Sequence, residues 1–270
     1  MDNILSRTSS VRQSPLRLIQ ITDLHIRAVP GGIQGCEVNT DVALARVLDQ
    51  IRLYENPLDL VVATGDLVHD PQPSAYRRLR NMLMKLNQPV CCLPGNHDDP
   101  YLAEDILKGG MLSCPKLLTL DDWVLILLDS TVKEAVHGYL DEEELALLDE
   151  TLSRHPARHA LIFLHHPVYP IGSPWMDRVG LHNADALFAV LERHAQVRGV
   201  VFGHIHQCFE RVHKGIRLFG SPATSVQFAP RSKTLMLDSL PPAYRRLALY
   251  PDGQIVSDIA FLHEAARKRA

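Results

Sequence analysis

The sequence contains no long apolar run. None of its windows approaches the ~18 consecutive apolar residues that cross a bilayer, so no membrane span is expected. Its beginning, with Asp2, Arg7 and Arg12, also lacks the apolar stretch of a secretory signal peptide. We therefore expect a cytoplasmic protein that has no membrane partner.

Neither the cysteines nor the basic residues form a pattern typical of a specialised protein. The five cysteines show no CxxC spacing and are odd in number, so we interpret them as buried reduced thiols. Lysine and arginine number 28 against 31 acidic residues, a net charge of −3, and they form no continuous block. A nucleic-acid partner is not expected, because its backbone is bound through clustered positive charge.

The chain does contain many histidines, 14 in 270 residues. Imidazole is the commonest metal ligand, so the positions of these residues matter. The remaining composition, with 46% hydrophobic and 22% charged residues, is that of an ordinary globular protein. No linker or repeat divides the chain, and we expect one domain over residues 15–262 with polar extensions at 1–14 and 263–270.

Short apolar runs alternate with helical patterns along most of the chain, which predicts an α/β fold. The expected strands are residues 16–21, 58–63, 90–93, 124–128, 160–164 and 197–202. Helical spacing predicts a helix over 41–54 and a second helix that Asp141 caps. Beyond residue 205 the strand-like runs lie close together, and we expect them to form a meander that makes a second sheet. The whole would then be two packed sheets flanked by helices.

Five of the apolar runs end in groups of polar residues that can bind metals. These groups are Asp23-Leu24-His25, Gly65-Asp66, Gly95-Asn96-His97-Asp98, His165-His166-Pro167 and Gly203-His204-Ile205-His206. Ligands bind at the carboxyl ends of strands in open α/β sheets, so we expect the five loops to meet. Any one group alone is ordinary turn chemistry, in which glycine permits positive φ and aspartate bonds nearby backbone. All five together instead predict a metal site.

The number of potential ligands favours two ions over one. Seven side chains qualify: Asp23, His25, Asp66, Asn96, His165, His204 and His206. This is too many for a single ion that keeps an open position, whereas two ions that share a carboxylate are the usual arrangement for displacement at phosphorus. Asp66 is the expected bridge. Oxygen and imidazole ligands without thiolate indicate two divalent ions, iron or manganese first, with zinc or magnesium as alternatives.

The motifs follow one another in the order DxH, GD, GNHD, H and GHxH, and in this order they resemble the calcineurin-like metallophosphoesterase superfamily. The resemblance spans about residues 17–260 and implies a four-layer αββα sandwich of two mixed β-sheets. It also implies the ligands of each ion. One ion would be held by Asp23, His25, Asp66 and His206, and the other by Asp66, Asn96, His165 and His204. His97 would be a catalytic histidine that binds no metal.

Further stretches are similar to bacterial class III 3',5'-cyclic AMP phosphodiesterases. They are residues 19–23, 38–40, 63–67, 93–98, 203–207 and 221–228, together with Trp175, Asp177 and Asn183. Close members of that group have glycine where this chain has Glu37, and cysteine where it has Ser225. The resemblance implies hydrolysis of cAMP to 5'-AMP, and so control of cAMP-dependent signalling. The residues expected to contact the substrate are His25, Asp66, Asn96, His97 and His206.

The expected reaction is in-line attack by a metal-activated water on the cyclic phosphate. His97 would act as general acid and protonate the leaving O3'. Either Asp70 or Asp98 would orient its ring, and the sequence does not choose between them. Asp98 is alternatively the cap of a helix that begins near Pro100.

Other polar residues receive structural interpretations. His166 is expected to pack behind the site, and Trp175 and Asn183 to pack or cap the following helix. The histidines outside the five motifs, His69 among them, are expected at the surface.

Two other functions stay open. The same fold and ligands serve other substrates, so hydrolysis of another phosphodiester or of a phosphomonoester is the first alternative. The second is a binding scaffold that has lost catalysis, although every expected ligand is intact. A monomer and a homodimer both remain open.

Overall fold

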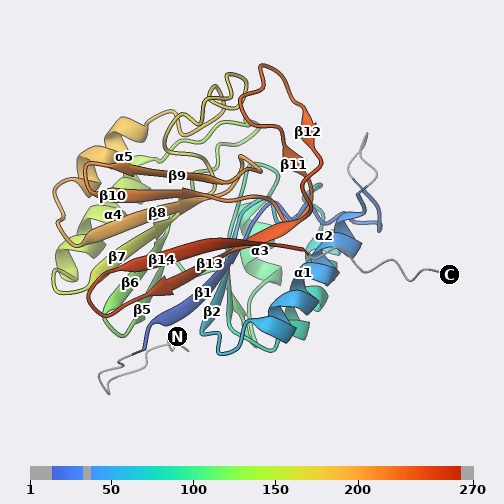
Figure 1. The fold of residues 1–270 in the computed structure, drawn as a ribbon, viewed down its shortest axis with the longest axis horizontal. Helices are drawn as coiled ribbons and strands as arrows, with labels where there is room; N and C mark the ends of the chain where they lie inside the picture. The colour runs from blue at the N-terminus through green and yellow to red at the C-terminus, as the bar shows by residue number, and fades with distance from the viewer. Residues whose placement is uncertain (1–13, 33–37, 263–270) are drawn as a thin grey trace.

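The computed structural model describes residues 14–32 and 38–262. Two six-stranded β-sheets lie face to face, and helices cover the outer face of each sheet (Figure 1). This four-layer αββα sandwich confirms the predicted fold class. Among the described residues, no helix is long and apolar enough to span a membrane.

The first sheet combines the earliest strands with the last two. Its order is β14-β13-β1-β2-β3-β4. β1 to β4 run parallel, whereas β13 pairs antiparallel with both β1 and β14. The strands are β1 (Leu16–Ile21), β2 (Leu60–Thr64), β3 (Val90–Leu93), β4 (Leu112–Ser113), β13 (Ala243–Leu249) and β14 (Ile255–Phe261).

The second sheet has the order β5-β6-β7-β8-β10-β9. β6, β7, β8 and β10 run parallel, and the edge strands β5 and β9 are antiparallel to their neighbours. The strands are β5 (Leu117–Leu120), β6 (Trp123–Leu127), β7 (His159–Phe163), β8 (Val197–Phe202), β9 (Phe209–His213) and β10 (Ile216–Gly220). A separate hairpin pairs β11 (Gln227–Phe228) with β12 (Leu237–Asp238).

The helices form two groups, one on each outer face (Figure 1). The first sheet is covered by α1 (Thr40–Tyr54), α2 (Pro73–Leu83), the short 3₁₀ helix η1 (Met84–Leu86) and α3 (Pro100–Ile106). The second sheet is covered by α4 (Glu142–Arg154) and α5 (Ala184–Leu191).

Side chains at the helix starts satisfy backbone N–H groups that have no partner within the helix. Asn39 caps α1, and Asp141 caps α4 as the sequence predicts. The cap of α3 is Asp99, so the alternative of Asp98 as its cap is wrong by one residue. Asn183 occupies the cap position of α5 without making a side-chain cap bond.

Successive side chains along a strand point to opposite faces of the sheet, and the apolar ones build three layers. Ile19 of β1 and Ile162 of β7 face the helices on their respective sides. Leu18 and Phe163, one residue away, pack together with others in the layer between the sheets. Because the parallel strands are buried on both faces, the loops at their ends start from fixed positions.

Arg245 of β13 joins the two sheets and is fully buried. Its guanidinium donates to the Gly220 carbonyl at 2.9 Å, to Ser221 Oγ at 2.9 Å, and to Glu210 Oε1 and Ser257 Oγ at 2.6 Å each. Glu210 and Gly220 belong to the second sheet and Ser257 to the first. One charged side chain therefore bridges both layers.

The predicted C-terminal meander is wrong. Its strands form, and both residues of the Lys214-Gly215 turn between β9 and β10 have positive φ. They do not make a sheet of their own, however. β10 pairs with β8 in the second sheet, and β13 pairs with β1 in the first. A local sequence pattern can predict that a strand forms. Which strand it pairs with depends on packing between segments that are distant in sequence.

The thiols follow the prediction of burial only in part. Cys91 and Cys92 are buried, Cys114 is half-buried, Cys208 is exposed, and all four are free. Burial raises the pKa of the Cys91 thiol to about 11, so it stays protonated at neutral pH. Cys36, like Glu37, lies outside the described residues.

Candidate metal centre

The five predicted loops meet at the carboxyl ends of parallel strands in both sheets. The first sheet contributes the residues that follow β1, β2 and β3, namely Asp23, His25, Asp66 and Asn96. The second sheet contributes those that follow β7 and β8, namely His165, His204 and His206. Backbone hydrogen bonds hold the loops together, since the Asp23 N–H donates to the Gly65 carbonyl and the Gly203 N–H to the His165 carbonyl.

The backbone turns the two DxH ligands toward the same side. Asp23 and His25 have φ of 55° and 48°, and Leu24 between them is fully buried in the apolar core. The segment His204-Ile205-His206 has the same form, with φ of 66° and 48° at its histidines. Positive φ is uncommon outside glycine and concentrates at functional sites. Each motif thus directs two ligands inward while its middle residue anchors the loop.

Asp66 lies between histidines of the two sheets. Its Oδ2 is 3.6 Å from Nε2 of His25, and its Oδ1 is 3.4 Å from Nε2 of His165. Beside it, Asp23 Oδ1 is 3.2 Å from Nε2 of His206. All five side chains are buried. Asp23, His25 and His206 bring their ligand atoms within 4.8 Å of one another, and so do Asp23, Asp66 and His165.

The remaining predicted ligands surround His165. Its Nε2 is 3.2 Å from Asn96 Oδ1 and 3.2 Å from Nδ1 of His204. His204 is itself placed by its peptide N–H, which donates to the Asp23 carboxylate at 3.1–3.2 Å. The structure therefore brings all seven predicted ligands into one cluster.

Backbone carbonyls orient two of the imidazoles. Nδ1–H of His165 donates to the Thr64 carbonyl at 2.9 Å, and Nδ1–H of His206 donates to the Val226 carbonyl at 2.6 Å. A histidine that ligates a metal usually donates its other ring N–H in this way. Both rings therefore present Nε2 to the centre.

Burial and charge together set the protonation of the cluster. Burial alone would raise the pKa of the Asp66 carboxyl, but His165 outweighs it and holds that pKa well below the usual value. Burial also opposes protonation of His165, yet Asp66 raises its pKa to about 9. Burial lowers the pKa of His25 to about 3 and that of His204 well below its usual range. The latter two are therefore neutral imidazoles, the form that binds metals.

The donor set fits metal ions. Nε2 of His204 is buried without a hydrogen-bond partner, which costs about 1–3 kcal/mol for a polar atom. A metal ion would use its lone pair. Among the described residues, the clusters of potential ligands contain aspartate and histidine but no cysteine, which suits divalent ions such as manganese, iron or zinc.

His97 lies beside the cluster and is held from two sides. Its peptide N–H donates to Asp66 Oδ1 at 3.0 Å, and its ring Nδ1–H donates to the His69 carbonyl at 3.0 Å. Neither Asp70 nor Asp98, the two carboxylates predicted to orient the His97 ring, bonds its Nδ1–H. Asp70 pairs with an arginine instead, and Asp98 binds backbone. A carbonyl oxygen thus takes the orienting role for which the sequence offered Asp70 or Asp98.

Asp98 ties two of the ligand loops together. Its carboxylate accepts hydrogen bonds from the N–H groups of Leu67, Val68 and Gly95 at 2.9–3.1 Å, and the Tyr76 hydroxyl donates to it at 3.0 Å. Burial raises its pKa to about 7. Its task is to fix the backbone that carries Asp66 and Asn96.

The glycines before the ligands serve two purposes. Gly65 has φ of 91°, as turn chemistry predicts. Gly95 and Gly203 have no positive φ and are needed for space. A Cβ at Gly95 would lie 2.3 Å from the Asp66 nitrogen, and one at Gly203 would lie 2.0 Å from Thr22 Oγ1. Turn chemistry therefore explains only one of the three.

His166 has the packing role that the sequence predicts. Its ring is buried, with Nε2–H donating to the Val136 carbonyl at 3.2 Å and Nδ1 2.8 Å from Ser130 Oγ. Asn183 also acts structurally, but its amide bonds the N–H and the carbonyl of Leu140 rather than capping its helix. Ser225 donates to the Asp23 carbonyl at 2.7 Å and so supports that ligand's backbone.

Two aromatic residues support His206. Phe228 stacks flat on its ring, with centroids 4.0 Å apart, and Trp175 packs edge-on against Phe228. Trp175 Nε1 also donates to Ser232 Oγ at 3.0 Å. The sequence does not predict this role of Phe228, although Phe228 lies in the 221–228 stretch, because stacking on a distant histidine leaves no local pattern.

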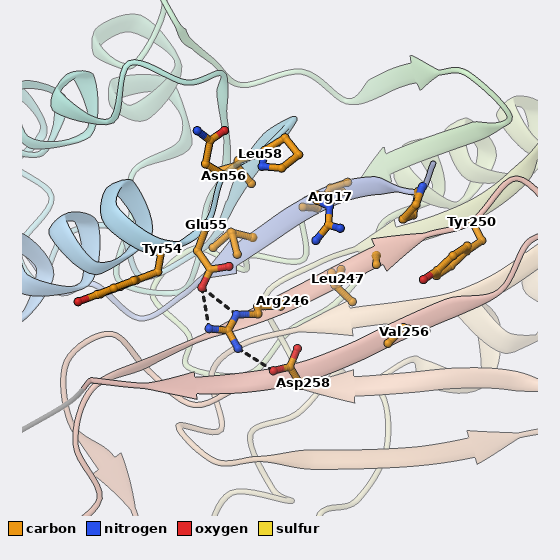
Figure 2. Close-up of a pocket in the computed structure, with 15 residues that line it drawn as sticks. Arg17, Tyr54, Glu55, Asn56, Leu58, Arg246, Leu247, Tyr250, Val256 and Asp258 are labelled. Carbon is orange, nitrogen blue, oxygen red and sulfur yellow. Dashed lines mark hydrogen bonds and ion pairs between the residues drawn. The ribbon is translucent and has the colours of Figure 1, made fainter. Parts of the chain in front are cut away.

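A cavity of about 270 Å³ lies away from this cluster (Figure 2). Arg17 lines it at the amino end of β1, opposite to the end from which Asp23 follows. Within it, Arg246 pairs with Glu55 and Asp258, as the dashed lines in Figure 2 show. None of the predicted ligands lines this cavity.

Comparison with known proteins is consistent with the order of the motifs. The calcineurin-like phosphoesterase family matches residues 16–208, a range that contains all seven predicted ligands. The chain belongs to this family. Calcineurin-like phosphoesterases use a dinuclear metal site, and the clustered aspartates and histidines provide the groups for one.

Relatives within the calcineurin-like phosphoesterases cover nearly the whole chain. The 3',5'-cyclic adenosine monophosphate phosphodiesterase CpdA of Haemophilus influenzae is 37% identical, over 93% of this chain and 91% of its own length. The 3',5'-cyclic-nucleotide phosphodiesterase alr5338 of Nostoc sp. is 39% identical, over 88% and 90%. Among solved structures, a dimetal phosphatase from Danio rerio has a TM-score of 0.61 at 15% identity and covers 93% of this chain and 100% of its own. At this low identity, the similarity to the Danio rerio structure shows a shared fold and nothing further.

Proposed function

We propose that this chain is a metal-dependent phosphodiesterase that hydrolyses 3',5'-cyclic AMP to 5'-AMP. Relatives that carry the name of this activity are 34–37% identical over 90–94% of the chain. Such hydrolysis would lower the cytoplasmic level of cAMP and so regulate cAMP-dependent signalling. The catalytic domain would be residues 15–262.

The placement of Asp66 carries the proposal. Its two carboxylate oxygens face histidines of different sheets, His25 at 3.6 Å and His165 at 3.4 Å. A carboxylate placed in this way can bridge two ions. One ion would then be held by Asp23, His25, Asp66 and His206, and the other by Asp66, Asn96, His165 and His204. Iron or manganese is our first assignment, with zinc or magnesium as alternatives.

When bound, the two ions would supply a nucleophile from water and positive charge for the phosphoryl oxygens. The protein's own contribution is to position the phosphate, and we assign that contact to His25, Asp66, Asn96, His97 and His206. Of these residues, His25 is a neutral imidazole and Asp66 an anionic carboxylate, so neither can neutralise a phosphate by itself. Substrate binding should therefore depend on the ions.

We assign the role of general acid to His97. Because its Nδ1–H donates to the His69 carbonyl, Nε2 is the atom that can deliver a proton to O3' as the P–O3' bond breaks. Its peptide N–H, bonded to Asp66 Oδ1, fixes its position relative to the bridging carboxylate. The ring can therefore act without binding a metal itself.

Product analysis tests this function. The purified protein, reconstituted with Mn²⁺ or Fe²⁺, is incubated with 3',5'-cAMP, 3',5'-cGMP and 2',3'-cAMP, and the products are separated by chromatography. We expect 5'-AMP from 3',5'-cAMP. If that substrate is not converted while a control substrate is, the assignment to cAMP is wrong.

Two model substrates separate the alternatives. A phosphodiesterase should favour bis(p-nitrophenyl) phosphate, and a phosphatase should favour p-nitrophenyl phosphate. Absence of turnover of both, by protein shown to contain metal, would indicate a binding scaffold. Size-exclusion chromatography with light scattering would distinguish a monomer from a homodimer.

A further inference from the structure

His69 contacts two histidines of the site at once. Its ring Nδ1 is 3.5 Å from Nδ1 of His25. Its ring also stacks on that of His97, with centroids 5.1 Å apart and planes inclined by 21°. In addition, its carbonyl accepts the Nδ1–H of His97. Nothing in its sequence position, three residues after Asp66, indicates such contacts.

If His25 binds a metal through Nε2, only one placement of the ring protons of His25 and His69 is consistent with their contact. Nε2 of His25 faces Asp66 at 3.6 Å and is the atom directed to the metal centre. A neutral imidazole that ligates through Nε2 carries its proton on Nδ1. That N–H then points at Nδ1 of His69, which must be the acceptor, so His69 carries its own proton on Nε2.

His25 differs in this respect from His165 and His206. Those two donate their Nδ1–H groups to carbonyls of Thr64 and Val226. Among the described residues, the partner of the His25 Nδ1 is another side chain, that of His69, at 3.5 Å. The orientation of this ligand therefore depends on a residue that can be replaced without altering the backbone.

We propose that His69 is a positioning residue, whose ring nitrogen accepts a hydrogen bond from His25 and whose ring face supports His97. Through His25 it sets the affinity of one metal position, and through His97 it sets the orientation of the general acid. The inference rests on the metal centre of the proposed function, but not on the identity of the substrate.

Three substitutions separate the two contacts. His69→Gln keeps an acceptor atom, His69→Phe keeps a ring that can stack but has no acceptor, and His69→Ala has neither. The carbonyl that holds His97 is retained in all three. His155→Phe is the matched control, because His155 ends α4 and precedes the amino end of β7, whereas the predicted ligands follow the carboxyl ends of strands.

The readout is Mn²⁺ affinity, measured by titration calorimetry on chelator-treated protein, with thermal unfolding of the metal-free form as a check on folding. We expect His69→Phe and His69→Ala to bind one Mn²⁺ about 10–100-fold more weakly, as is typical when the partner of a ligating histidine is lost. His69→Gln and His155→Phe should bind as the wild type does. In the alanine variant kcat should fall further than in the phenylalanine variant.

Two results would overturn the inference. One is unchanged Mn²⁺ affinity in both His69→Phe and His69→Ala, and the other is an equal loss in His69→Gln, which would show that the acceptor is irrelevant. Absence of Mn²⁺ binding by the wild type would instead refute the metal centre. Normal binding without cAMP turnover would refute only the substrate assignment.

Discussion

Asp66 accepts a hydrogen bond from the peptide N–H of His97, and in the proposed function these two residues have separate chemical tasks. Asp66 faces histidines of both sheets and is placed to bind metal. The ring of His97 is engaged by the carbonyl and the ring of His69, on the rim of the cluster. Substitution at these two positions should separate metal binding from proton transfer.

The first prediction follows from this separation. His97→Ala should retain its metal and lose about 10²–10⁴-fold in kcat, because general-acid assistance typically contributes that much. Asp66→Ala should lose metal, since it removes oxygens placed toward both ion positions. Metal content by mass spectrometry and cAMP turnover check the pair. Full activity of His97→Ala would show that another group donates the proton.

A second prediction concerns space beside a ligand. In Gly95→Ala the new methyl group would lie 2.3 Å from the Asp66 nitrogen and 2.4 Å from its Oδ1, so the Asp66 backbone and carboxylate must shift. We expect weaker Mn²⁺ binding and lower activity. Gly31→Ala is the control, because its Cβ would have no neighbour closer than 4.0 Å. Equal Mn²⁺ affinity of the two variants would contradict the close approach of Gly95 to Asp66.

Residue types and their order were enough to predict which side chains gather at the site. Asp23 and His25, for example, follow a strand directly, and strand ends in a parallel arrangement meet at one edge. For His69, in contrast, the sequence predicts a surface position. It lies in the loop after Asp66, and only the tertiary arrangement shows that this loop returns beside His25 and His97.

At the scale of elements, one carboxylate links the loops after β2 and β3. Asp98 accepts from three buried N–H groups, those of Leu67, Val68 and Gly95. In the described part of the chain, these three N–H groups donate to Asp98 and not to a backbone carbonyl. The geometry of two ligand loops therefore depends on a residue that binds no metal in our assignment.

The third prediction compares two adjacent aspartates. Asp98→Ala should lower the free energy of unfolding by about 3 kcal/mol, because each buried unpaired donor costs about 1–3 kcal/mol. Asp99→Ala removes only the cap of α3 and should cost about 1 kcal/mol. Urea unfolding measures both. A larger effect at Asp99 would mean that the loop contacts are replaced by water.

The positions of the strands in the sequence are more predictable than the pairing of one strand with another. Residues 16–21, 90–93 and 197–202 are strands with the predicted bounds, because short β-branched apolar runs favour strands wherever they lie. Assignment of the last strands to a separate sheet failed. β13 is adjacent to β1, far away in sequence, and no local pattern encodes that pairing.

At the scale of the whole molecule, Arg245 is one link between the sheets. The fourth prediction is that Arg245→Met lowers the free energy of unfolding by about 3 kcal/mol, as loss of a buried charged partner does. The neighbouring Arg246 pairs with Glu55 and Asp258 nearer the surface, and Arg246→Ala should cost about 1 kcal/mol or less. Similar midpoints in chemical unfolding of the two variants would contradict a bridging role for Arg245.

The metal centre should be a second link, because its ligands come from both sheets. The fifth prediction is that chelation lowers the melting temperature by about 5–10 °C, since ligand at 100 times its Kd stabilises by about 2.7 kcal/mol. Differential scanning calorimetry with and without added Mn²⁺ measures this shift. Asp66→Ala serves as the control, and its melting temperature should not respond to Mn²⁺.

The sheet order also bears on synthesis of the chain. β1 lies inside the first sheet because β13 pairs with it, Leu16 opposite Leu249 and Gln20 opposite Arg245. A ribosome releases residues 16–21 long before residues 243–249. During that interval an apolar strand exposes one row of unpaired N–H and carbonyl groups, which can recruit other nascent strands. Until β13 has been synthesised, the first sheet therefore lacks the strand that covers this edge of β1.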